Sequence, residues 1–290
     1  MITDNGKPNI DDALREEMVK CYADPLRFVL MAYPWEVAGT ELERWPGPDE
    51  DQRAFLKELG EEVAKRGFNG VTPVKPIKMA RSSGRGTGKT ARSAWIVDWL
   101  MSTRMNCVGT VTANNNHQLQ TKTWAAVRYW TSLCITGHWF TLTSQRMEHK
   151  AMPAAWFVQP QSCKPENYEA FLGQHAASST SFYIFDEASG IDDKIFEAAR
   201  SSMTDGEPMM IIFGNPTKRR GQLHRACFGS EMDQWNHGII DARKSALSNK
   251  QDIAEQIQIY GEDSDYCRVW IYGLPPNASD LQYIDAGLVD

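Results

Sequence analysis

The sequence lacks several features that would place the protein outside the cytosol. No apolar run approaches the roughly 20 residues that a membrane-spanning helix needs. The first residues, Met1 to Lys7, contain no apolar stretch suited to a secretory signal peptide. The six cysteines lie far apart without a C-x-x-C pair, which disfavours both a disulfide framework and a zinc site. These absences predict a protein that is not secreted, does not enter a membrane and carries reduced thiols.

Basic charge is also scarce. The formal net charge is −6, which argues against a protein that coats nucleic acid with a broad basic face, although a local basic track stays possible. Repeats and low-complexity tracts are missing as well. What remains is ordinary for a globular protein, with 42% hydrophobic and 10% aromatic residues. A chain of 290 residues holds one large α/β domain or two smaller ones.

The most informative stretch is residues 81–90, R-S-S-G-R-G-T-G-K-T, here called the phosphate loop. A short predicted strand (76–80) precedes it, and a predicted helix (91–104) without Gly or Pro follows it. In this context, backbone N–H groups and a helix N-terminus surround the phosphates of a nucleotide. The pattern assigns phosphate binding to the segment from Ser83 to Lys89, contact with the β- and γ-phosphates to Lys89, and a Mg²⁺ ligand to Thr90. Ser83 stands where the usual pattern has its first glycine, and an ordinary glycine-rich turn is the alternative.

A second candidate element is the strand 181–185, which leads directly into Asp186 and Glu187. Carboxylates at the end of a buried strand need a compensating charge or donor. In phosphate-loop enzymes the first carboxylate holds Mg²⁺ and the second polarises the attacking water. The sequence therefore predicts Asp186 as a metal ligand and Glu187 as the catalytic carboxylate. The alternative is a strand that runs into a helix cap.

A third predicted strand, 208–213, ends at Gly214-Asn215-Pro216-Thr217. Ligand sites in open α/β sheets lie where several strands end, so Asn215 is a candidate for contact with the γ-phosphate or the water. A simple turn residue before Pro216 is the alternative.

Gln52 heads the apolar stripe of a predicted helix, 50–65. It either forms a capping box with Asp49 or contacts the adenine of ATP. The sequence does not separate the two.

Other segments complete the pattern. Helices are predicted at 9–21, 24–31, 118–134, 191–203 and 252–260, and strands at 107–112, 156–158, 235–242 and 267–272; residues 135–155 show no clear pattern. The densest basic cluster is Lys218, Arg219, Arg220, His224 and Arg225. It is a DNA contact, a source of an arginine for a neighbouring subunit, or a solvated face.

Taken together, residues 24–276 resemble the ATPase domain of the large terminase subunit of tailed bacteriophages. The resemblance rests on several motifs, of which the Asn-Pro-Thr ending and the arginine inside the phosphate loop are the most selective: Asp24-Pro25, Tyr33-Pro34-Trp35, Gln52, Gly84 to Thr90, Phe185 to Ala188, Gly214 to Thr217, Tyr260-Gly261 and Arg268 to Pro275. Asp51 stands where relatives often have tryptophan, which departs from the adenine motif.

The resemblance implies a motor that hydrolyses ATP with Mg²⁺ to drive double-stranded DNA into a procapsid in the host-cell cytoplasm. It implies as partners a portal protein, a small terminase subunit and other copies of the chain in a pentameric ring, with a monomer in isolation. By the same resemblance, Arg85 is an arginine finger acting in cis, and Arg200 or Arg219 is a candidate for a finger acting in trans.

The expected fold is a three-layer α/β P-loop NTPase of the additional-strand, catalytic-glutamate class, with a mostly parallel sheet and helices on both faces. The expected divisions are a small helical segment (1–66), an ATPase core (67–276) and a linker (277–290) toward a nuclease domain that the chain does not include, so no nuclease activity is expected. Two other functions remain open: a helicase-like or remodelling translocase, and a nucleotide-dependent switch with slow turnover.

Overall fold

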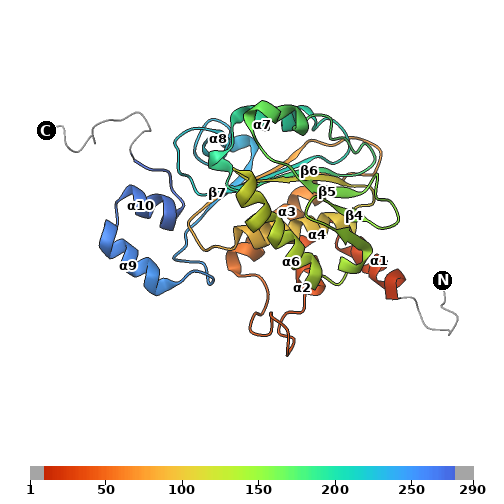
Figure 1. Cartoon of the computed structure of the whole chain (residues 1–290), viewed down its shortest axis with the longest axis horizontal. Coiled ribbons are helices and arrows are strands. Elements are labelled where there is room, and N and C mark those ends of the chain that lie inside the picture. The colour runs from red at the N-terminus through yellow and green to blue at the C-terminus, as the bar shows by residue number, and fades with distance from the viewer. Residues whose placement is uncertain (1–9, 278–290) are drawn as a thin grey trace.

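The computed structural model describes residues 10–277. Its centre is an 8-stranded sheet in the order β3-β4-β5-β2-β6-β7-β1-β8 (Figure 1). The strands are β1 (Ile77–Ser83), β2 (Val108–Thr112), β3 (Phe140–Leu142), β4 (Met147–His149), β5 (Phe157–Pro160), β6 (Ser181–Phe185), β7 (Met209–Gly214) and β8 (Asn236–Ile240). The helices are α1 (Ile10–Lys20), α2 (Pro25–Ala32), α3 (Glu50–Arg66), α4 (Lys89–Thr103), α5 (Asn116–Gln118), α6 (Trp124–Leu133), α7 (Asp193–Ser201), α8 (Gln222–Phe228), α9 (Lys250–Tyr260) and α10 (Asp265–Cys267).

Strands β5, β2, β6, β7, β1 and β8 are parallel to their neighbours in that series, whereas β4 pairs antiparallel with both β3 and β5 at one edge of the sheet. Every residue of β6 and of β7 is buried, as expected for parallel strands covered on both faces. Strand β7 lies between β1 and β6. An additional strand thus separates the phosphate-loop strand from the strand that ends in Asp186 and Glu187, which confirms the predicted fold class.

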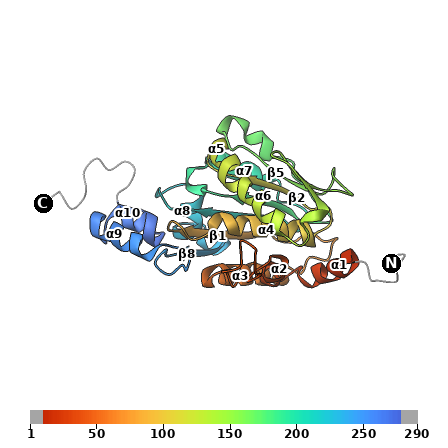
Figure 2. The ribbon, with the colours of Figure 1, turned by 60° about the horizontal axis from the view of Figure 1, so that its bottom comes forward.

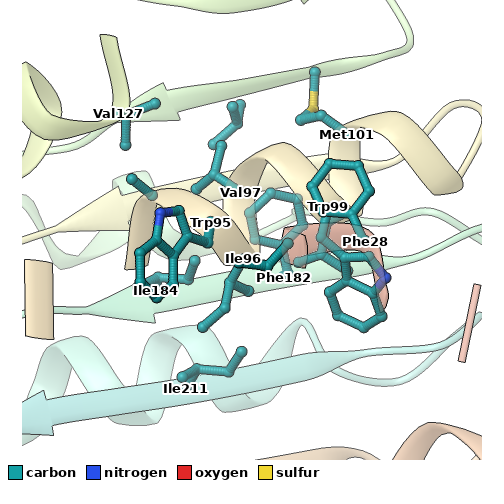
Figure 3. Close-up of a cluster of buried hydrophobic side chains, with 14 of the residues drawn as sticks. Phe28, Trp95, Ile96, Val97, Trp99, Met101, Val127, Phe182, Ile184 and Ile211 are labelled. Atoms are coloured by element: carbon teal, nitrogen blue, oxygen red, sulfur yellow. The ribbon is translucent and has the colours of Figure 1, made fainter. Parts of the chain in front are cut away.

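Helices cover both faces of the sheet, in three layers. Phe182 and Ile184 of β6 join the core that includes α4 and α6, whereas Tyr183 and Phe185 join the core that includes α7 and α8. Figure 3 shows the first core, where Trp95, Ile96 and Trp99 of α4 lie among side chains from the sheet and from α2. The sheet is therefore filled from both sides by alternating side chains.

Helices α1, α2 and α3 lie along the outer side of α4 (Figure 2). The indole Nε1 of Trp99 donates a 2.8 Å hydrogen bond to the carbonyl of Cys21, and Tyr33 donates a 2.8 Å bond to the buried carboxylate of Asp98. Arg104 and Glu207 form a buried ion pair at 3.2 Å, to which Tyr22 also donates a hydrogen bond. The N-terminal helices thus share a core with α4. The division of the chain at residues 66 and 276 stays a prediction.

Two segments differ from the sequence-based prediction. Residues 267–272 are not a strand, because α10 continues there into a π-helix, Arg268–Tyr272, that packs its apolar residues Val269 and Ile271 inward. An apolar run of this length fits a buried helical turn as well as a strand. Residues 135–155 contain the hairpin β3–β4, whose strands are too short to leave a clear pattern.

Some predictions fall outside the described residues, namely the cap at Asn9 and residues 278–290 of the expected linker. In the described part of the chain all six cysteines are buried and unbridged. No helix among residues 10–277 has both the length and the apolar character to cross a membrane.

Candidate functional site

The phosphate loop runs from the end of β1 into the start of α4. It is packed so tightly that side chains are excluded at two glycines. A Cβ on Gly84 would overlap the carbonyl oxygen of Ile271, and a Cβ on Gly88 would overlap Nε2 of Gln52. Gly88 also has φ 71°, a left-handed conformation that glycine adopts without strain. Both glycines are therefore dictated by the shape of the loop.

Lys89 lies inside the loop and is almost fully buried. Its Nζ donates to Oδ1 of Asn215 at 3.1 Å and to the carbonyl of Gly84 at 3.4 Å. Burial lowers the pKa of Lys89, and the carboxylates of Glu187 and Asp186 oppose that shift. Asn215 in turn donates from Nδ2 to the carbonyl of Ser83 at 2.6 Å. The structure thus brings Asn215 of the third strand end directly against the phosphate loop.

The first carboxylate of the acidic strand end meets the start of α4. Oδ2 of Asp186 accepts hydrogen bonds from Thr90 Oγ1 at 3.4 Å and from Thr123 Oγ1 at 2.9 Å. A hydroxyl and a carboxylate on adjoining elements are hard oxygen donors, and Mg²⁺ is usually held by one or two protein oxygens besides phosphate and water. Thr90 and Asp186 therefore fit a magnesium ion. Thr123 was not among the predicted residues, because its position follows from a π-helical turn, Leu119–Thr123, that the sequence does not reveal.

Glu187 has an unusual backbone. Its φ of 52° and ψ of 41° lie in the left-handed region, which non-glycine residues occupy at a cost and mainly at functional sites. Burial raises the pKa of its carboxyl, whereas the nearby Lys89 lowers it. A carboxyl with a raised pKa beside a phosphate-binding loop is suited to act as a general base.

These residues enclose one polar cavity of about 510 Å³. Its lining includes most of the predicted site: Arg85, Gly86, Thr87, Gly88, Lys89, Thr90, Glu187 and Asn215, together with Ala91, Gln118, Lys122 and Trp270. Among the lining residues that the sequence analysis missed, Trp270 carries the clearest contact. The guanidinium of Arg85 lies over its ring, 3.9 Å from the centroid.

Gln52 caps helix α3 and also lines a cavity. Its Oε1 accepts from the backbone N–H of Asp49 at 2.9 Å, while Asp49 accepts from the N–H of Gln52, so the predicted capping box is confirmed. Its Nε2 is buried without a hydrogen-bond partner in the described chain. Gln52 also lines a second cavity, of about 260 Å³, whose walls include five aromatic side chains: Trp35, Trp45, Trp95, Tyr129 and Trp130. Ala91 lines both cavities, so the two adjoin the start of α4.

A buried arginine of α4 donates a hydrogen bond to the phosphate loop. Arg92 of α4 is fully buried, and its Nη2 donates to the carbonyl of Thr87 at 2.9 Å. Desolvation lowers its pKa to about 10. The signal available in the sequence was an arginine in a helix that is otherwise apolar nearly all round.

Within the basic cluster after β7, Arg225 is paired with neighbouring carboxylates, as is the nearby Arg200 of α7. Arg225 pairs with Asp193 at 2.8 Å and with Glu231 at 3.0 Å, and Arg200 pairs with Glu231 at 2.7 Å. Arg219 donates to the carbonyl of Asn277 at 2.8 Å. Of the three alternatives for the cluster, a freely solvated face therefore does not describe Arg225.

Comparison with models of known protein families finds no match. A probable terminase large subunit of Enterobacteria phage P7 is 25% identical over 211 residues, covering 69% of this chain and 42% of that protein. The chain thus spans less than half the length of this curated relative.

Solved structures with a similar fold are also phage large terminases. The large terminase of bacteriophage HK97 superposes with a TM-score of 0.62 and 14% identity, covering 88% of this chain and 55% of that one. The large terminase of a thermophilic bacteriophage, solved in complex with ADP, gives a TM-score of 0.53 and 13% identity, covering 68% and 48%. The chain is thus similar in sequence to a phage large terminase subunit and shares the fold of solved phage large terminases over the part that superposes.

Proposed function

We propose that the chain is a Mg²⁺-dependent ATPase that powers translocation of double-stranded viral DNA into a procapsid. One observation carries the enzymatic part. Thr90 Oγ1 and Asp186 Oδ2 lie 3.4 Å apart, and Thr90 lines the same cavity as Lys89 and Glu187. The phosphate loop and the acidic end of β6, which are distant in sequence, thus meet at one site.

In the proposed mechanism, the amides from Ser83 to Lys89 bind the phosphates, and Lys89 leaves Asn215 to neutralise the β- and γ-phosphate oxygens. Thr90 and Asp186 would hold Mg²⁺, which when bound neutralises charge on the same oxygens. Glu187 accepts a proton from the attacking water or orients it, a role that its raised pKa favours. Arg85 stabilises charge that develops on the transferred phosphoryl group. An arginine in this role accelerates hydrolysis by ~10³ to 10⁵ in related NTPases.

The aromatic cavity beside Gln52 is the proposed site of the adenine. A flat apolar base suits walls of tryptophan and tyrosine. Gln52 Nε2 and Trp95 Nε1 are buried donors without partners in the described chain, and an acceptor on the base edge would satisfy a donor aimed into the cavity. The capping box leaves Nε2 of Gln52 free for this contact, so the two predicted roles of Gln52 are compatible.

The DNA-related part of the proposal rests on the relatives. The sequence relative is named a probable large terminase, and one of the structural relatives was solved with ADP. On that basis we propose double-stranded DNA, a portal protein, a small terminase subunit and further copies of the chain in a ring as partners, in the host-cell cytoplasm. Arg219, at the exposed edge after β7, is the remaining candidate for a finger acting in trans.

The deciding experiment is steady-state ATP hydrolysis by the purified chain, with and without linear duplex DNA. We expect Mg²⁺-dependent turnover that is lost on chelation and that duplex DNA alters. Binding of ATP with negligible turnover in both conditions would favour the slow switch. Separation of the strands of a forked duplex would favour a helicase-like translocase instead.

A further inference from the structure

We infer that Trp270 is a positioning residue that holds the guanidinium of Arg85 at the mouth of the phosphate cavity, and that Trp270 acts on turnover only through Arg85. The inference rests on the proposed function, since it concerns the same site. It adds a residue from the C-terminal helical segment to a site otherwise built from β1, α4, β6 and β7.

Two contacts join the residues. The Arg85 guanidinium carbon lies 3.9 Å from the centroid of the Trp270 ring, a close cation–π arrangement. The backbone N–H of Arg85 also donates to the carbonyl of Trp270 at 2.7 Å. Both the main chain and the side chain of Arg85 thus contact Trp270.

Trp270 is itself held in place by its own segment. The carbonyl of the next residue, Ile271, accepts from the N–H of Ala242 at 2.8 Å and packs against Gly84 so closely that a Cβ there would overlap it. Two residues further on, the carbonyl of Gly273 accepts from Ser82 Oγ at 2.7 Å. Trp270 also lies in a π-helix, a rare form that is frequent at functional sites. The main chain that carries the ring is therefore anchored to β1 and to the segment that follows β8.

The position of the ring argues against a purely structural role. Trp270 is only half-buried, and it lines both the phosphate cavity and a neighbouring cavity of about 380 Å³ beneath α9. Arg85 is exposed and, within residues 10–277, makes no ion pair with a carboxylate. A cation resting on a ring beside a phosphate site is available to an incoming phosphate, because charge-assisted bonds to phosphate are stronger than the contact with the ring. The stack keeps the Arg85 guanidinium near the phosphate site. It also restricts the orientations of the free side chain, so that less conformational entropy is lost when the guanidinium binds phosphate.

The test is a double-mutant cycle on ATP turnover, with Trp270→Ala, Trp270→Phe, Arg85→Ala and both alanine variants combined. We expect Trp270→Ala to lower kcat about tenfold with KM changed less than about twofold, since a cation–π contact and pre-orientation act on the rate. Trp270→Phe should retain most of the activity. In the Arg85→Ala background, Trp270→Ala should cause no further loss. Tyr168→Ala, which removes an exposed ring from the segment Pro165–Phe171, serves as the matched control that keeps wild-type turnover.

A second measurement does not depend on hydrolysis. Adding ATP-γ-S should change the tryptophan emission of the wild type, and this change should be reduced in both Trp270→Phe and Arg85→Ala. Additive losses of kcat in the cycle, or an emission change that is the same in all three proteins, would overturn the role of Trp270. Absence of turnover in the wild type would instead count against the proposed ATPase, while the emission change would still report on the contact between Trp270 and Arg85.

Discussion

Asn215 holds the ammonium group of Lys89, with Nζ 3.1 Å from Oδ1, while its own Nδ2 bonds to the carbonyl of Ser83. Asn215 therefore gives Lys89 a hydrogen-bond acceptor that does not neutralise its charge. An amide is a weaker partner for an ammonium group than a phosphate is, so the lysine can be transferred when nucleotide binds.

This relationship predicts the effect of Asn215→Asp. A carboxylate at this place would form a buried ion pair with Lys89 and compete with the phosphates, so KM for ATP should rise about tenfold or more. The variant should be compared with Asn167→Asp, a matched change on the exposed segment Pro165–Phe171, by steady-state hydrolysis. An unchanged KM would mean that Lys89 does not contact the phosphates.

Glu187→Gln should bind ATP with near wild-type affinity while kcat falls by about a hundredfold or more, because the amide cannot accept the proton of the attacking water. Equilibrium binding of a fluorescent ATP analogue and steady-state turnover give the two quantities. Glu61→Gln, exposed on α3, is the matched control. Equal loss of binding and turnover would remove Glu187 as the catalytic carboxylate.

Gln52→Glu separates the two roles of Gln52. The substituted side chain keeps an oxygen for the N–H of Asp49 but loses the Nε2 donor, so ATP binding should weaken about tenfold, while the carboxylate buried at this position should lower the thermal midpoint. Calorimetry and nucleotide titration measure the two effects, with Gln251→Glu on exposed α9 as the control. If affinity is unaffected, Gln52 is only a cap.

Asp98 predicts a pH dependence of stability. Burial raises the pKa of its carboxyl to about 7, and hydrogen bonds from Thr131 and Tyr33 oppose that shift. The folded state then binds a proton more tightly than the unfolded state, whose carboxyl titrates near its ordinary value of 3.8. The contribution of Asp98 is thus fully present at low pH and is lost as pH rises toward about 7.

Asp98→Asn should remove this contribution. The free energy of unfolding of the variant, measured by urea denaturation, should decline less than that of the wild type between about pH 5 and 8, by on the order of a few kcal/mol. Asp233→Asn, on the exposed turn Met232–Gln234, should leave the wild-type pH profile unchanged. Parallel profiles for the wild type and Asp98→Asn would contradict the assignment.

Much of the fold could be predicted from local pattern. Strands β6 and β7 are largely apolar runs with an abrupt polar ending, and β1 is marked by the fixed spacing of the phosphate loop that follows it, so the three strands and their shared edge followed from the sequence. The order of β1, β7 and β6 was inferred only from the type of residue at the end of β6.

The rest depends on contacts between distant segments. Trp270 reaches Arg85 through a helical turn that reads equally well as a strand, and Thr123 reaches Asp186 through a π-helical turn with no sequence signature. Trp95 and Trp130 appear in the sequence as core residues, and only the packing of the loop before α3 shows that they also line a cavity with Gln52. Side-chain periodicity carries no information about such pairs.

The phosphate loop and residues 270–273 are joined largely by main-chain hydrogen bonds, directly from Arg85 to Trp270 and indirectly through the end of β8, where Gly84 donates to Ile240 and Ala242 donates to Ile271. Bonds of this kind do not depend on which side chains the segment carries. Substitutions in residues 270–272 should therefore leave this segment attached to the phosphate loop. Positions 84 and 273 must keep glycine, because a Cβ on Gly84 would overlap Ile271 and a Cβ on Gly273 would overlap Ser83. A one-residue insertion in residues 270–273, unlike most substitutions, would break these hydrogen bonds, because it would shift each acceptor out of line with its donor.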